Sequence, residues 1–307
     1  MKVALNNRLH DISILLIVFF SAPIYALEIS KPRFLVEKQP IPPAIGVKAD
    51  LPISSVDYTS AGQSFSTHQA HTDVESYLVP VVSTRQNLII VGPGYMSDRM
   101  FDARATAIPA FMNGVYANIF ATGSIGEKWF WLTYQSYGWF DSQLTKATVD
   151  SGKYFQFANF GYKWNEKFSI SAGALYASNF GNHTLLPLLN LSWSIGYFIL
   201  DVALPLRAEI RFIPVPEFHL IASGKFFQTS YRDAETGGLS GNTQYIQLTR
   251  VEAALSAEIR IASWSWLTTG VKYLGETRYA AIGQMAREMG VVIPEIQIFV
   301  GAIIRPD

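Results

Sequence analysis

Four residues in the first third of the chain have side chains of the types that bind metal ions. His68 and His71 are followed by Asp73 and Glu75, and imidazole and carboxylate groups are common zinc ligands. Positions three apart on a β-strand lie on opposite faces, so the two histidines converge only if a turn or helix intervenes. We therefore expect a solvated loop here, with no metal and no cofactor.

Ser178 and His183 have side chains of the types used in nucleophilic catalysis. A serine becomes a nucleophile when a histidine takes its proton, but such groups are recognised by their geometry, which this spacing does not provide. His219 would share a strand face with Ser223 and Lys225, and we interpret it as a hydrogen-bonding residue rather than a base. We expect no catalytic residue.

Charged side chains spaced two apart form a larger set in the second half of the chain. They mix both signs and come from segments close in sequence. The set comprises Arg207, Glu209, Arg211, Arg250, Glu252, Glu258, Arg260, Lys272, Glu276 and Arg278.

The segments that carry these charges are predicted to be long strands with one apolar face. From Phe198 to Phe212 every second residue is apolar, and the same pattern recurs from Leu248 to Ile261. Successive side chains of a strand point to opposite faces, so each segment has an apolar face and a charged face. Such long two-faced strands are typical of transmembrane β-barrels, although a soluble β-sandwich is the alternative.

Inside a barrel the ten charged residues have two interpretations. They could line a wet, weakly selective pore, or they could pair with one another and fill the interior. Barrels of about 8 strands are filled, whereas those of about 16–18 leave a channel, and this chain is predicted to lie between. The mixed signs favour pairing, so we predict a narrow or occluded barrel with these residues as lumen-lining candidates.

The N-terminus is predicted to direct export. Lys2 and Arg8 precede an apolar run at 12–20 and the small residues that suit cleavage after Ala26, so 1–26 is interpreted as a signal peptide. Residues 27–52 are rich in proline and are interpreted as an extended periplasmic lead-in. The remaining segment, 53–307, is predicted to be one outer-membrane β-barrel.

Composition excludes some classes of function. The chain has 24 basic and 24 acidic residues, so nothing indicates a nucleic-acid partner. It has no cysteine, which excludes disulfides and thiol chemistry. Its 7 Trp, 15 Tyr and 20 Phe suit the interfacial belts of a barrel, and we expect the two ends of Trp129–Phe140 to lie in those belts.

Turn residues divide the barrel segment into twelve predicted strands, with short and long connections in alternation. The alternation places both termini in the periplasm. The predicted strands are 53–66, 72–83, 87–98, 107–122, 129–141, 153–164, 168–179, 197–213, 218–231, 243–262, 266–279 and 294–304.

Fourteen strands are the alternative. Leu186–Ile195 also alternates, and a tight turn at Pro205 would then keep the strand number even. The apolar phase runs straight through Pro205, however, as expected of one strand. We therefore prefer twelve strands, with 180–196 as an outer loop or lumen plug.

Four segments carry a resemblance to known proteins: Phe160-Gly-Tyr-Lys-Trp164, Gly173-Ala-Leu-Tyr176, Leu188-Leu-Asn-Leu-Ser-Trp193 and Ala203-Leu-Pro-Leu-Arg207. The chain resembles uncharacterised outer-membrane β-barrel families of Gram-negative bacteria over most of 50–304. The resemblance implies an outer-membrane location, with membrane lipid and the barrel-assembly machinery as partners. It carries over no catalytic residue, and this chain lacks the terminal aromatic residue that ends such barrels.

These observations together predict a non-enzymatic outer-membrane barrel, which acts as a narrow pore for passive transport or has a structural role in the envelope. The alternative is an outer-membrane hydrolase that acts on lipid or lipopolysaccharide.

Overall fold

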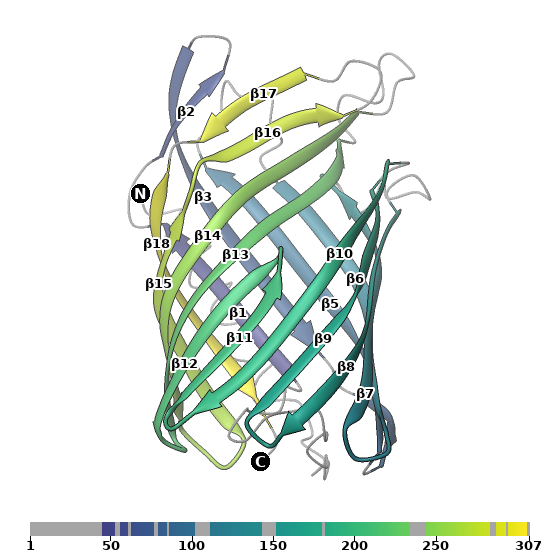
Figure 1. Cartoon of the computed structure of the whole chain (residues 1–307). Helices are drawn as coiled ribbons and strands as arrows, with labels where there is room; N and C mark the ends of the chain where they lie inside the picture. The colour runs from purple at the N-terminus through teal and green to yellow at the C-terminus, as the bar shows by residue number, and fades with distance from the viewer. Residues whose placement is uncertain are drawn as a thin grey trace.

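The computed structural model describes residues 45–52, 56–60, 63–76, 79–84, 86–101, 111–142, 152–179, 182–233, 244–282, 287–292 and 294–305. These residues are all-β, and Figure 1 shows their strands wrapped into a barrel. Within them, no helix has the length and hydropathy needed to cross a membrane. The strands are β1 (Ile45–Pro52), β2 (Val56–Ser60), β3 (Gln63–Ser76), β4 (Val79–Ser83), β5 (Asn87–Phe101), β6 (Phe111–Ile125), β7 (Trp129–Asp141), β8 (Gly152–Asn165), β9 (Phe168–Asn179), β10 (Asn182–Ile195), β11 (Phe198–Leu204), β12 (Arg207–Val215), β13 (Phe218–Asp233), β14 (Gln244–Arg260), β15 (Ser265–Leu274), β16 (Thr277–Ile282), β17 (Arg287–Val292) and β18 (Glu295–Ile304).

Antiparallel ladders join these strands into a closed ring. From β1 the ring passes to β3 and β5, continues in chain order from β6 to β15, and returns through β18. Counted over the described residues, the ring contains fourteen strands. The other four, β2, β4, β16 and β17, extend the sheet beside it.

One parallel bridge crosses the ring. It joins Asp141, at the end of β7, to Arg232, near the end of β13. On one side it closes a nine-strand circuit through β14, β15, β18, β1, β3, β5 and β6, and on the other it closes a seven-strand circuit that contains β8 to β12.

The two faces of the wall differ as the sequence predicts. On β14, Val251 and Leu255 are 59% and 62% exposed, whereas Glu252 and Glu258 are 2% and 5% exposed. The apolar face therefore points away from the barrel and the charged face points into it. The burial of Arg250, Glu252 and Glu258 agrees with the predicted charged inner face, whereas Arg260 at the end of the strand is only half-buried.

Five short connections lie together at one end of the barrel. Figure 1 shows the turns that follow β6, β8, β10, β12 and β14 at the lower end with the C-terminus, and β2, β16 and β17 at the upper end. Gly126 and Gly196 occupy two of these turns with φ of 67° and 59°, a region that glycine enters without steric cost. The prediction of short turns at this end is therefore borne out, but the predicted alternation holds only in part, because the β9–β10 and β11–β12 turns at the opposite end are also short.

The prediction that 197–213 forms one strand is wrong. The chain turns at Pro205, where the Leu206 amide donates a hydrogen bond of 2.7 Å to the Ala203 carbonyl, and β11 pairs with β12. Ala203 lies opposite Arg207, so three residues form the loop. Opposed residues of this hairpin are both even-numbered or both odd-numbered, so the apolar phase continues through the turn and alternation cannot reveal it.

The prediction of a loop or plug at 180–196 is also wrong, because Asn182–Ile195 is strand β10, paired with β9 and β11. The ladders thus follow the fourteen-strand alternative rather than the preferred twelve. The two-residue turn at Gly196 reverses the apolar phase between β10 and β11, which explains the break in the pattern there.

The barrel begins earlier in the chain than predicted. The sequence predicts that Ile45–Pro52 belongs to the proline-rich lead-in, but this segment forms β1 and closes the ring between β18 and β3. Residues 67–71 were expected between strands and lie within β3. The prolines before Ile45 favour an extended linker, and the alternation of apolar and charged residues in β1 is too short to predict a strand on its own. The predicted signal peptide and most of the lead-in lie outside the described residues.

Candidate functional site in the barrel interior

The first group of interior charges is centred on Glu258 of β14. Its Oε2 accepts hydrogen bonds from Nη1 of Arg211 at 2.7 Å and from Nη1 of Arg305 at 3.0 Å. His219 lies opposite Glu258 in the β13–β14 ladder, with Nδ1 3.3 Å from the same oxygen. Arg211 also donates to Glu209 at 3.0 Å. We call these five residues the Glu258 cluster.

An aromatic ring covers one side of the Glu258 cluster. The buried ring of Trp266 lies 4.7 Å from the ring of His219 and 5.1 Å from the Arg305 guanidinium carbon. The cluster is therefore closed by protein on several sides, and its charges are held in an environment with little water. In such an environment each pair depends on both of its members.

The second group surrounds Glu252, on the same face of β14. Its carboxylate accepts a hydrogen bond from Arg250 Nε at 2.6 Å and forms an ion pair with Lys225 Nζ at 2.9 Å. Lys225 lies opposite Glu252 in the ladder, and Lys272 lies opposite Ala254, one rung along the same face. We call these four residues, Lys225, Arg250, Glu252 and Lys272, the Glu252 cluster. The register of the neighbouring strands β13, β14 and β15 brings these four residues together.

A third set of contacts spans the interior between β7, β8 and β13. Arg232 Nε donates to Asp141 Oδ2 at 2.7 Å, and the Ser142 amide donates to the Arg232 carbonyl at 2.9 Å. Lys153 Nζ donates to Thr229 Oγ1 at 2.9 Å. We call these five residues the crossbar. Asp141, Ser142, Lys153 and Thr229 are all less than 9% exposed.

Apolar side chains fill the interior beside the crossbar. Tyr231 and Met112 are completely buried. The ring of Phe140 lies 6.0 Å from that of Tyr231 and 6.1 Å from that of Tyr116, and Lys153 Nζ lies 4.2 Å above it. The Tyr231 hydroxyl reaches the sulfur of Met96 on β5 at 3.4 Å. Side chains from β5, β6, β7 and β13 thus meet across the nine-strand circuit.

The structure brings together only part of the predicted set. Arg211, Arg250, Glu252, Glu258 and Lys272 are buried, and Glu209 is half-buried. These six belong to the two clusters.

The other four candidates lie apart from the clusters. Arg207 is exposed and 3.7 Å from Asp201. Arg260 donates to the Ser263 carbonyl in the turn after β14. Glu276 and Arg278 form an exposed pair, 2.6 Å apart, where the chain leaves β15. Each sits close to a strand end, where alternation no longer determines which way a side chain points.

Sequence reasoning missed Asp141, Lys153, Arg232 and Arg305. Their partners are distant in sequence: Arg232 is 91 positions from Asp141, and Arg305 is 47 from Glu258. A signal existed for Lys153, since it shares the inward phase of β8 with Asn159. No local pattern could have paired it with Thr229.

The other sequence candidates occupy the wall. His183 lies opposite Ser178 in the β9–β10 ladder, and its Nδ1 is 2.8 Å from the Tyr176 hydroxyl. His68 and His71 lie in β3, and their side chains fall outside the described residues. Among the side chains that the structure does describe, no group of three or more His, Asp or Glu residues is placed to hold a metal ion.

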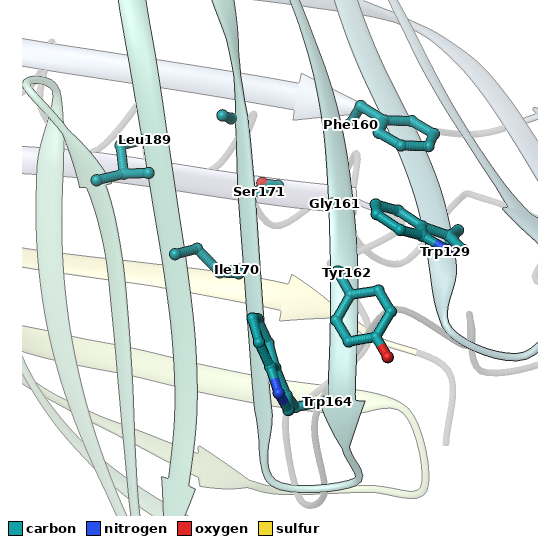
Figure 2. Close-up of a pocket in the computed structure, with 9 residues that line it drawn as sticks. Trp129, Phe160, Gly161, Tyr162, Trp164, Ile170, Ser171 and Leu189 are labelled. Atoms are coloured by element: carbon teal, nitrogen blue, oxygen red, sulfur yellow. The ribbon is translucent and has the colours of Figure 1, made fainter.

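Aromatic rings line a shallow pocket of about 570 Å³ on the outer wall. Figure 2 shows Trp129, Phe160, Tyr162 and Trp164 around it, with Ile170 and Leu189 on the adjoining strands. The rings of Trp129 and Phe160 are stacked 5.2 Å apart. Several of these side chains are exposed, so this is a surface of apolar contact and not an enclosed binding site.

Solved structures with similar shape are outer-membrane proteins of different activities. The NanC porin aligns at 7% identity over 85% of this chain and 100% of its own, with a TM-score of 0.37. A TodX monoaromatic hydrocarbon channel mutant aligns at 10% identity over 87% of this chain and 91% of its own, with a TM-score of 0.39. The outer membrane protease OmpT from Escherichia coli aligns at 9% identity over 88% and 99%, with a TM-score of 0.24. These TM-scores are below 0.5, and the alignments say nothing about activity.

A search of curated proteins gives no match. A family model described as "Domain of unknown function (DUF6268)" matches residues 86–282, which span β5 to β16 and include the Glu252 and Glu258 carboxylates. The chain belongs to this family.

Proposed function

We propose that this protein is an outer-membrane β-barrel that serves passive transport, and that its interior is occluded at rest. One observation carries the proposal: an exposed apolar wall surrounds buried charges that are paired with one another. An exposed apolar face is stable in lipid, and paired charges avoid the cost of a bare charge in a low-dielectric interior.

The aromatic residues on the outer wall support a membrane location. Trp129 and Trp139 are exposed at opposite ends of β7. Ten residue steps at about 3.3 Å each, on a strand tilted by about 40°, give a height of roughly 25 Å, which is that of the apolar band of an outer-membrane barrel. We propose that these residues lie in the two interfacial belts.

Fractionation and electrophoresis test the membrane assignment. The protein should sediment with outer membranes, show β-type circular dichroism in detergent and migrate faster on gels before heating than after. Recovery in the soluble periplasmic fraction would contradict the proposal.

Reconstitution tests the transport assignment. In planar bilayers the protein should show low conductance with rare openings, and in liposomes it should raise the permeability to small solutes over that of protein-free vesicles. A large, steady conductance would mean that the interior is open, and a lack of any permeability increase would favour a purely structural role.

A hydrolase is the second candidate, and the position of His183 opposite Ser178 is the observation that favours it. A catalytic histidine normally has its Nδ1 oriented by a carboxylate, whereas here Nδ1 faces the Tyr176 hydroxyl. Lipid extracts of cells that carry the native chain or Ser178→Ala separate the candidates. Deacylated products that depend on Ser178 would support the hydrolase, and identical lipid profiles would support transport.

A further inference from the structure

The wall of the barrel is interrupted above the β11–β12 hairpin. β10 pairs with β11 only from Leu189 to Ile195, and β12 pairs with β13 only as far as Lys225. Within the described strands, no ladder joins Asn182–Leu188 of β10 or Phe227–Ser230 of β13 to a neighbour on the side that the hairpin leaves open. Figure 1 shows the hairpin ending part of the way up the barrel, between β10 and β13. We call this interruption the gap.

Exposed apolar side chains from three strands stand on the outer side of the rim, beside the polar His183 and Gln228. Leu185 of β10 is 71% exposed, Leu204 at the hairpin tip is 52% exposed, and Phe226 of β13 is 46% exposed. The Phe226 amide donates to the Leu206 carbonyl, which marks the lower limit of the gap. A charged molecule would lose its hydration against this rim, whereas an apolar molecule would lose nothing.

Apolar side chains also lie on the inner side of the gap. Leu188 of β10 and Leu175 of β9 are buried on the inward face. Beyond them the crossbar joins β7 and β8 to β13, so the gap belongs to the seven-strand circuit and the crossbar separates it from the nine-strand circuit.

An open sheet edge at membrane depth requires an explanation. Unpaired backbone groups facing hydrocarbon cost several kcal/mol each, and such edges persist only where they line a cavity or are covered by protein. A longer β11–β12 hairpin, reaching the height of β10 and β13, would pair these backbone groups and seal the wall. The exposed apolar side chains around the gap are those expected around an opening towards lipid.

We propose that the gap is a lateral portal through which uncharged, apolar molecules pass between the barrel interior and the hydrocarbon layer of the membrane. The crossbar forms the inner boundary of the portal. This inference rests on the proposed transport function and adds to it the class of transported molecule and the route.

Cysteine labelling tests whether the gap opens to lipid. The chain has no cysteine, so single variants give a clean signal. Leu188→Cys lies behind the gap, and Ile199→Cys is the matched control, since Ile199 is equally buried but lies on β11 between two complete ladders. In vesicles, pyrene maleimide dissolved in the bilayer should label Leu188→Cys about tenfold faster than Ile199→Cys, because a sealed wall excludes the reagent. Equal rates in folded protein, verified by heat-modifiable migration, would overturn the portal.

Cross-linking tests whether the portal carries flux. Leu185→Cys/Phe226→Cys can be bridged with bis-maleimides of graded length, and Leu255→Cys/Val271→Cys is the control, because these exposed residues lie opposite each other in a complete ladder. Bridging the first pair should lower the transfer of the apolar dye N-phenyl-1-naphthylamine about fivefold or more, as expected if the apolar rim is the route. Bridging the control pair should leave transfer unchanged.

The two failures are distinguishable. If the unbridged protein transfers the dye and bridging Leu185 to Phe226 changes nothing, the portal is wrong and passive transport stands. If the unbridged protein transfers neither the dye nor a small sugar such as arabinose, the proposed transport function itself is wrong, and the portal with it.

Discussion

At the scale of single residues, the interior is organised by two carboxylates. Glu258 accepts hydrogen bonds from two arginines, Glu252 accepts one from Arg250 and is ion-paired with Lys225, and both carboxylates are almost completely buried. Removing one member of a buried pair leaves the other as an unpaired charge, and this penalty exceeds the net stabilisation that the intact pair provides. Loss of the carboxylate is therefore the more informative substitution.

Glu258→Ala is expected to destabilise the barrel by about 3–5 kcal/mol, because Arg211 and Arg305 would lose their common partner. Arg207→Ala is the matched control: its ion pair with Asp201 is long and exposed, and its loss should cost about 0–1 kcal/mol. Urea unfolding in lipid vesicles, followed by tryptophan fluorescence, measures both. Equal stability of the two variants, with altered conductance in Glu258→Ala, would instead indicate an open, water-filled interior.

At the scale of elements, the crossbar links β13 to β7 and β8, neither of which is its neighbour in the ring. The β7–β13 bridge, the Arg232–Asp141 pair and the Lys153–Thr229 hydrogen bond all act between the same two regions. The interior is thereby divided into two circuits, and side chains fill the boundary between them.

Lys153→Met is expected to open this boundary, since methionine keeps much of the packing against Phe140 but cannot donate to Thr229. Single-channel recordings should show larger or more frequent openings than those of the native chain. Lys163→Met, which removes a lysine on the same strand from an ion pair at a turn, is the control and should leave the recordings unchanged. Indistinguishable recordings for both variants would show that the crossbar does not restrict conduction.

The exposed apolar face of the strands leads to a second prediction at the scale of elements. Leu255→Arg would place a charge on an exposed apolar position, which at the centre of a bilayer costs about 2–4 kcal/mol. Glu217→Arg, in the exposed turn between β12 and β13, should have little effect. Unfolding in vesicles and the yield of folded protein measure the difference. A Leu255→Arg variant as stable as Glu217→Arg would mean that this face meets water and not lipid.

At the scale of the whole molecule, the arrangement of connections defines two ends. The turns after β6, β8, β10, β12 and β14 are short and lie at the end that carries the C-terminus. The long connections after β5, β7 and β13 lie at the other end, together with the short β9–β10 and β11–β12 turns. Bacterial barrels place short turns in the periplasm and long loops outside the cell. We propose this orientation for the present chain.

Epitope tags inserted at Ser151 and Gly238, which lie outside the described residues, should therefore bind antibody on intact cells. Tags at Glu166 or Glu217, in the turns after β8 and β12, should bind only after the outer membrane is permeabilised. Flow cytometry before and after permeabilisation makes the comparison, and the reverse pattern would show that the barrel has the opposite orientation.

The sequence by itself determined the two-faced wall, because the direction of a side chain on a strand depends only on its position along that strand. The apolar outer face, the charged inner face of β14 and the change of phase at Gly196 were all readable from local alternation. The number of strands could not be predicted from local alternation. A hairpin with a three-residue loop preserves the phase, so the turn at Pro205 does not interrupt the apolar pattern. The partners of the buried charged residues could not be predicted either. Glu258 contacts Arg305, and Asp141 contacts Arg232, only because the strands that carry them pair in a particular register although they are far apart in the chain. The gap between β10 and β13 follows from the length of that one hairpin, and only the closed ring of strands shows which edges it leaves unpaired.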